Sequence, residues 1–286
     1  MKKKIICLFS AFLCIFFLAS CGQKSTEEIL NSTLDKLNSI ENIDESLNLS
    51  CTIPNSSPIT MKINAKAIPK ESKFYADFSM DIMIMKLSMT MNASQEKIFV
   101  KFNDIFPKYI DMTDSEEGKE FLKTASKSNF SNSSSEYNNI FKVAFDEAKK
   151  NNTKLTKAKK TINGSEQSLD QLSLSLNSDE LNNVLKSAIK DSFSESGSDL
   201  SNDPATKEMF DSLKVSDMTI DTYINKDYVP IYTEIKFKIN IGNESADCST
   251  EMIINAYDSK IDIPEVKESD IATPEELKNS PFSNIQ

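Results

Sequence analysis

The chain has 286 residues, with 33 Lys+Arg against 43 Asp+Glu and a net charge of −10 at neutral pH. It contains no His, and all of its basic residues are Lys, which excludes imidazole acid–base catalysis, His-ligated metals and Ser-His-Asp triads. The acidic balance argues against nucleic acid as a partner. We expect no cofactor and no bound metal.

Residues 1–20 have the parts of a secretory signal: a basic head at Lys2–Lys4, a short apolar body at 5–17, and small residues before Cys21. The apolar body is too short to cross a bilayer as a helix, which takes about 20 residues. The last four residues of this segment, Leu-Ala-Ser-Cys, resemble the lipobox of bacterial lipoproteins. That resemblance implies removal of residues 1–20 and acylation (palmitate) of Cys21, with residues 21–25 as a lipidated tether.

After the tether, apolar residues at 26–43 recur with the period of an amphipathic helix. The period then changes to two, which predicts strands at 47–53, 59–67, 74–84, 83–93, 98–102 and 107–112. The alternation changes parity near residues 82–86, which indicates a tight turn or a bulge there.

The middle of the chain is predicted to be mostly helical. We expect helices at 116–127, about 136–148 and 179–194, a short helix after Asp203-Pro204, and strands at 153–162 and 167–176 around Asn163-Gly164. The last third alternates strictly and predicts a meander of strands at 218–224, 229–241 and 246–256. One apolar and one polar face are typical of an antiparallel sheet that is covered on one side.

These patterns predict an α+β fold: a strongly curved antiparallel sheet of about eleven strands, with helices covering its concave face. We expect one domain at 26–268, followed by a loosely ordered tail at 269–286 that is rich in acidic residues.

Two cysteines, Cys51 and Cys248, fall on apolar-facing positions of predicted strands. In an extracytoplasmic setting they could pair as a disulfide, and they could equally remain as two buried thiols. The sequence leaves both alternatives open.

The sequence contains no supported catalytic motif. Ser187 and Lys190 have S-x-x-K spacing, but no K-T-G segment accompanies them, which indicates a chance match. The acidic residues from Asp111 to Glu117 lack the alternate spacing of a calcium loop and are typical of a solvated turn. We therefore expect a protein that is not an enzyme.

Methionine is concentrated in residues 80–91. Met is flexible and polarizable, so it either fills irregular core space or lines an adaptable binding surface, and periodicity does not separate these alternatives. The residues that we predict to line a ligand cavity are Phe78, Met80, Ile82, Met85, Met89, Met91, Ile235, Phe237 and Met252.

The order of the predicted elements resembles the lipoprotein-carrier superfamily, which includes the LolA and LolB carriers and the LppX and LprG lipoproteins. The segments 73–77, 97–101, 218–224 and 260–264 are similar to an uncharacterised family of lipoproteins from low-GC Gram-positive bacteria. The resemblance covers 26–268. It implies a LolA/LppX-like domain, a half-open β-barrel whose hydrophobic cavity holds acyl chains and which has no catalytic residues.

We therefore expect a monomeric, non-catalytic lipoprotein on the outer face of the cell membrane, held there through lipidated Cys21. In this interpretation the cavity of the half-barrel binds a lipid or another hydrophobic ligand. The alternative is a surface interaction module with a filled core, which binds cell-envelope or protein partners.

Overall fold

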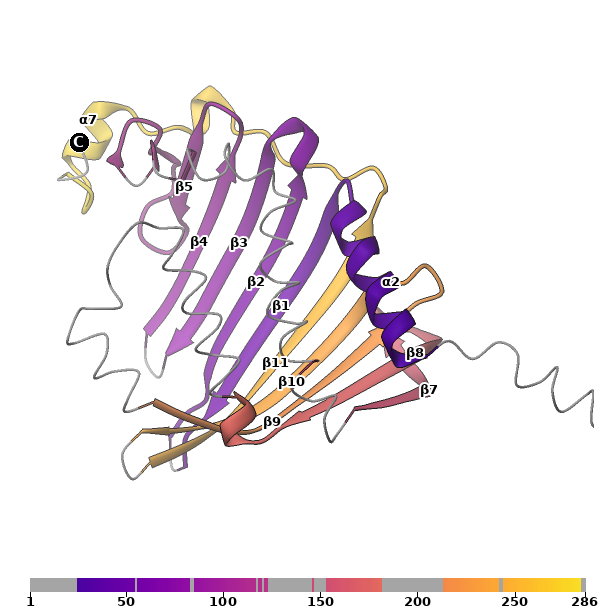
Figure 1. Ribbon diagram of the computed structural model, residues 1–286. Coiled ribbons are helices and arrows are strands. Elements are labelled where there is room, and N and C mark those ends of the chain that lie inside the picture. Colours follow the sequence, from indigo (N-terminus) through magenta and orange to yellow (C-terminus); the bar gives the residue numbers. More distant parts are fainter. Residues whose placement is uncertain are drawn as a thin grey trace, which may run out of the picture.

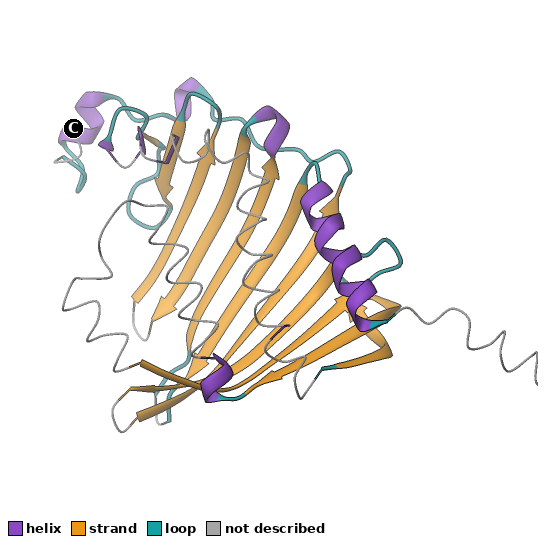
Figure 2. Ribbon diagram, viewed as in Figure 1, coloured by secondary structure: helices purple, strands orange, loops and turns teal. Residues whose placement is uncertain are grey.

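The computed structural model describes residues 25–54, 56–82, 85–116, 118–119, 121–122, 146, 153–181, 213–241 and 244–283. In these residues the chain forms one antiparallel sheet of eleven strands, accompanied by a few short helices (Figures 1 and 2). The strands are β1 (Ile43–Thr52), β2 (Ile59–Ile68), β3 (Lys73–Ile82), β4 (Met85–Ala93), β5 (Ile98–Phe102), β6 (Ile110–Asp111), β7 (Lys154–Ile162), β8 (Ser165–Leu176), β9 (Leu213–Ile224), β10 (Pro230–Ile241) and β11 (Glu244–Tyr257). The helices are α2 (Thr26–Ser39), η1 (Pro69–Glu71), η3 (Glu268–Asp270) and α7 (Pro274–Lys278).

The sheet consists of two meanders: an N-terminal meander of β1 to β6 and a C-terminal meander of β7 to β11. They meet where the first strand pairs with the last. Its order is β6-β5-β4-β3-β2-β1-β11-β10-β9-β8-β7, so β1 pairs with β11 at the centre. Leu47 lies opposite Met252 in that central pair. Because the two central strands come from opposite ends of the chain, the sheet is completed only when nearly the whole domain has been made.

The expectation of a strongly curved, half-open barrel was wrong. The sheet is twisted but neither closed nor strongly curled, and its outermost strands β6 and β7 stand at opposite edges (Figure 1). The described part of the chain is mostly β. Alternating polarity predicts which face of a strand is covered, but it carries no information on whether two edges meet. Here β6 has only two residues, which leaves little backbone for closure.

The expected number of strands is confirmed, and so is the closing meander. Ile82 pairs with Met85, so β3 and β4 meet as antiparallel neighbours at the predicted change of parity. Helix α2 begins as expected, with a capping box between Ser25 and Glu28, but it ends at Ser39 because Ile43 already belongs to β1. The expected helices at 116–127 and 179–194 are described only in part, with helical residues at 116, 118–119, 121–122 and 178–181. Those at 136–148 and after Asp203-Pro204 lie outside the described residues, apart from helical Asp146.

The alternating apolar residues of neighbouring strands share one face of the sheet, which we call the apolar face. One cross-strand row runs Leu47, Ile63, Phe78, Met89 and Phe102 through β1 to β5. The next row, Asn48, Lys62, Ser79 and Ser88, belongs to the opposite, polar face.

Helix α2 covers part of the apolar face (Figure 1). Its Ile29, Leu30 and Leu34 pack with Leu172 and Leu174 of β8 and with Ile220 of β9. Leu172 is 0 % exposed and Leu174 1 %. This cluster is the sealed core of the domain, and it lies in the half of the sheet built by the C-terminal meander.

Residues 258–283 form a C-terminal strap along one end of β1 to β5 (Figure 1). The strap is held by specific contacts: Asn92 donates a hydrogen bond to the Pro264 carbonyl at 2.5 Å, and Phe282 stacks on Phe102 with ring centroids 4.8 Å apart. Lys108 pairs with Glu276 of α7 at 2.8 Å. The segment from residue 269, which we expected to be loosely ordered, therefore has defined partners on the N-terminal meander.

Candidate functional site

The residues predicted to line a ligand cavity all lie on the apolar face. On the N-terminal meander, the cross-strand pairs of β3 and β4 place them there: Phe78 lies opposite Met89, Ala76 opposite Met91, and Ile82 opposite Met85. Met80 lies between Phe78 and Ile82 on the same side of β3. On the C-terminal meander, Met252 lies opposite Thr233, and Ile235 and Phe237 lie opposite Thr250 and Cys248. The two groups are separated by β1 and β2, so they form one surface only together with the residues of these strands.

Sequence reasoning missed the residues that join the two groups. Met61 of β2 lies opposite Met80, and Leu49 of β1 lies opposite Met61. Both residues follow the apolar–polar alternation of their strands, which places them on the apolar face. That they lie between the two groups depends on the order of the strands, which the alternation does not give.

The surface that these residues form is apolar but not sealed. Met85 is 61 % exposed, and the other predicted lining residues are half-buried. Under α2, by contrast, the apolar side chains of β8 are completely buried. At the start of β3, Phe121 lies over the face, with its ring centroid 6.4 Å from that of Phe74. The apolar face thus combines a closed core with an accessible region rich in Met.

A disulfide joins Cys51 of β1 to Cys248 of β11, with Cα atoms 4.1 Å apart. The alternative of two free thiols is thereby removed. The bond links the two meanders at the central pair of strands, next to the Met-rich region. Disulfides form and persist in oxidising compartments, which is consistent with an extracytoplasmic location.

A carboxylate without an ion pair among the described residues lies on the apolar face. Glu45 of β1 lies opposite Ala65 of β2 and Ile254 of β11, between Ile43 and Leu47 of its own strand. Its burial, and secondarily the nearby charge of Asp44, raises the pKa of Glu45. Sequence reasoning missed this residue, although a charged residue within an apolar alternation was visible in Ile43-Asp44-Glu45-Ser46-Leu47.

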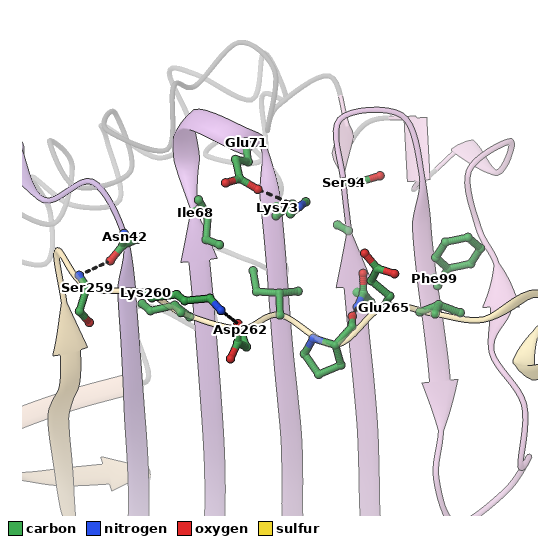
Figure 3. Close-up of a pocket in the computed structure, with 16 residues that line it drawn as sticks. Asn42, Ile68, Glu71, Lys73, Ser94, Phe99, Ser259, Lys260, Asp262 and Glu265 are labelled. Carbon is green, nitrogen blue, oxygen red and sulfur yellow. Dashed lines mark hydrogen bonds and ion pairs between the residues drawn. The ribbon is translucent and has the colours of Figure 1, made fainter.

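A hollow of about 580 Å³ lies between the strap and the ends of the N-terminal strands (Figure 3). Four of the five charged side chains in its lining are paired: Lys73 with Glu71 at 2.7 Å and Lys260 with Asp262 at 3.6 Å. Asn92, also in its wall, is engaged by Pro264. Since most of its polar groups already bind one another, the hollow fits a structural role better than a recognition site.

No other chemistry emerges from the described residues. Among them, no three Cys, Asp or Glu side chains gather to hold a metal ion, and no helix is long and apolar enough to span a membrane. Asp111 accepts a hydrogen bond from the Thr113 N–H at 3.0 Å, as in an ordinary turn. Ser187, Lys190 and the predicted lipidation site Cys21 lie outside the described residues.

Comparisons with known proteins give weak similarity to several solved structures. No protein-family model matches the chain, and no curated protein matches it. An alignment with the LolA superfamily protein NE2245 from Nitrosomonas europaea covers 85 % of this chain and 96 % of that chain, with 7 % identity and a TM-score of 0.23. A β-barrel-like protein of domain of unknown function DUF1849 from Brucella abortus aligns over 76 % of this chain and 100 % of that chain, with 10 % identity and a TM-score of 0.20. Similarity this low does not assign the chain to either family, so its function must be argued from its own residues.

Proposed function

We propose that this protein is a non-catalytic extracytoplasmic lipoprotein that binds a lipid or another hydrophobic ligand on the apolar face of its sheet. The observation that carries the proposal is the half-buried, Met-rich surface of β2 to β4, which continues across β1 onto β11. In this proposal the acylated Cys21 keeps the protein at the outer face of the membrane, close to a source of such ligands.

The physical case rests on the cost of leaving apolar surface in contact with water. Contiguous exposed apolar surface on a soluble domain marks an interaction or ligand-binding site. Sites for hydrophobic ligands are lined mainly by apolar side chains, with few polar groups for orientation. Met80, Met85 and Met89 suit such a lining because their unbranched side chains adapt to ligands of different shape.

A second candidate, a surface interaction module, is favoured by an aromatic cluster on the polar face. Tyr223 and Tyr232 pack edge to face with centroids 5.6 Å apart, and the Lys160 ammonium lies 3.9 Å from the centroid of Tyr232. Tyr is enriched at protein interfaces. Tyr232 itself is buried, at 5 % exposed, and donates its hydroxyl to Glu251, so the half-buried Tyr223 and Lys160 are the parts of the cluster that a partner would reach. This cluster is built from three strands of the C-terminal meander and lies on the side of the sheet away from the Met residues.

Binding of the uncharged fluorescent ester methyl cis-parinarate to residues 22–286 separates the two candidates. This chain contains every element that the structure describes. Met80→Glu places a charge on the apolar face, and Ser79→Glu places the same charge one residue away on the polar face. We expect the first variant to lose binding at least tenfold and the second to bind like the wild type, with unchanged circular dichroism in both. Equal binding by both variants would refute a site on the apolar face.

A further inference from the structure

Glu45 stands out because it is a charged side chain in the middle of an apolar surface. Its cross-strand neighbours on that face are Ala65 and Ile254, and beyond Ala65 the row continues with Ala76 and Met91. Since Ala65 is small, β2 places no large side chain over the carboxylate. The group is half-buried, so a molecule lying on the face can reach it.

Its neighbour Asp44 shows what a structural carboxylate looks like in the same strand. Asp44 lies on the polar face, where Asn255 donates a hydrogen bond to it at 3.0 Å and the Lys66 ammonium lies 3.7 Å away. Within the part of the chain that the structure describes, Glu45 receives neither a hydrogen bond nor an ion pair. A desolvated carboxylate without a partner is unfavourable, and a cation or strong donor placed beside it would offset that cost.

We propose that Glu45 binds the positively charged amine of an amphiphilic ligand whose hydrocarbon chain lies along the apolar face. The inference rests on the proposed function and adds the chemical class of the ligand. Charge complementarity selects the class. On this face β1 and its neighbours β2 and β11 offer Glu45 and no Lys near it. Helix α2, whose Leu37 and Ile40 pack in the same cluster as Ile43 and Ile254, carries Lys36, but Asp258 pairs with that ammonium. An amine is therefore attracted and a fatty-acid carboxylate is repelled.

The dimensions of the surface suit such a ligand. From Glu45 to Cys51 the strand advances six residues, about 20 Å at roughly 3.3 Å per residue. Along this distance the apolar face presents Leu47 and Leu49 of β1, with Ile63 and Met61 opposite them on β2. A long extended alkyl chain fits beside this row, with its amine at Glu45 and its end near the Met-rich ends of β3 and β4.

The test compares three single-chain amphiphiles of equal length: dodecylamine, dodecanol and dodecanoate. Their dissociation constants are measured at pH 7.5 by displacement of the uncharged ester methyl cis-parinarate from residues 22–286. We expect the amine to bind about tenfold or more tightly than the alcohol, as a charge-assisted hydrogen bond would provide, and the carboxylate to bind more weakly than the alcohol.

Two variants with the same change in net charge locate the effect. Glu45→Gln should abolish the preference for the amine while retaining dodecanol, and Asp44→Asn on the polar face should leave the preference intact. If all three compounds bind alike, or if both variants reduce the preference equally, the role of Glu45 is refuted and the apolar site stands. If none of the compounds binds, the proposed function fails together with this inference.

Discussion

Cys51 of β1 lies directly opposite Cys248 of β11, and the disulfide between them connects residues 197 positions apart. Among the described residues, β1 and β11 are the one pair of strands that joins the N-terminal meander directly to the C-terminal meander. The covalent bond therefore secures the join on which the continuity of the apolar face depends.

Reduction of this disulfide should destabilise the domain strongly. Because a long loop gains much entropy in the unfolded state when it is released, we expect the free energy of unfolding to fall by about 3–5 kcal/mol. Urea unfolding followed by circular dichroism, with and without reductant, measures this change. A Cys51→Ser/Cys248→Ser double variant should show the lower stability and no response to reductant. An unchanged midpoint in the reduced wild type would contradict the structural role of the bond.

The Glu45→Gln variant should be more stable than the wild type at neutral pH. Burial among Ala65 and Ile254, assisted by the charge of Asp44, raises the pKa of Glu45 in the folded state. Lys66, the nearest cation on β2, lies on the polar face beside Asp44. Below the unfolded pKa of about 4.3, Glu45 is protonated in both states and costs nothing. Its unfavourable contribution develops as pH rises through the folded pKa.

Thermal unfolding of the wild type and Glu45→Gln between pH 3.5 and pH 8 tests this sign. The melting temperatures should coincide at the acid end, and the variant should gain as pH rises. A variant that is less stable at pH 8 would show that the carboxylate has a stabilising partner in the free protein, which removes the reason for a ligand amine.

Asp258 should have the opposite pH dependence. Its carboxylate accepts hydrogen bonds from the Lys36 ammonium at 2.5 Å and from the Glu41 N–H at 2.8 Å, and so ties the end of α2 to the end of β11. Desolvation opposes ionisation, but these two hydrogen bonds prevail and lower the pKa of Asp258. The stabilisation is present above the unfolded pKa of about 3.9 and is lost as pH falls through the folded pKa.

Asp258→Asn should therefore lower the free energy of unfolding by about 1–2 kcal/mol at pH 7, with the difference vanishing in acid. Denaturant titrations at pH 7 and pH 3 provide the measurement. Asp262→Asn is the matched control, because the Asp262 and Lys260 side chains are 86 % and 88 % exposed and such pairs contribute little. Equal effects of the two substitutions would argue against a specific tie at Asp258.

The strands could be predicted because the sheet is covered on one side, so that almost every strand alternates between apolar and polar residues. Helix α2 was predicted too long at its C-terminal end because Ile40 and Ile43 continue its apolar stripe, although β1 already begins at Ile43. The open form of the sheet was not predictable from the same pattern. Closure depends on strand order and edge length, and neither affects the local alternation.

The face of the candidate site was predictable, but its extent was not. Parity alone places Phe78, Met80 and Met89 on one side, whereas the contribution of Met61 depends on the pairing of β2 with β3. The Cys51–Cys248 bond likewise depends on the register between strands at opposite ends of the chain. Glu45 was not predicted as a site residue because the alternation identifies the apolar residues of a face. A charged residue at one of these positions only weakens the pattern.

The central claim, that the apolar face holds a hydrophobic ligand, is tested most directly by native mass spectrometry of residues 22–286 purified without detergent. The account predicts a population heavier than the polypeptide, whose extra mass is released on denaturation and identified as a lipid. Ser79→Glu should retain this mass and Met80→Glu should lose it. A wild-type chain that carries the polypeptide mass alone, and that remains so after incubation with lipid vesicles, would contradict the claim.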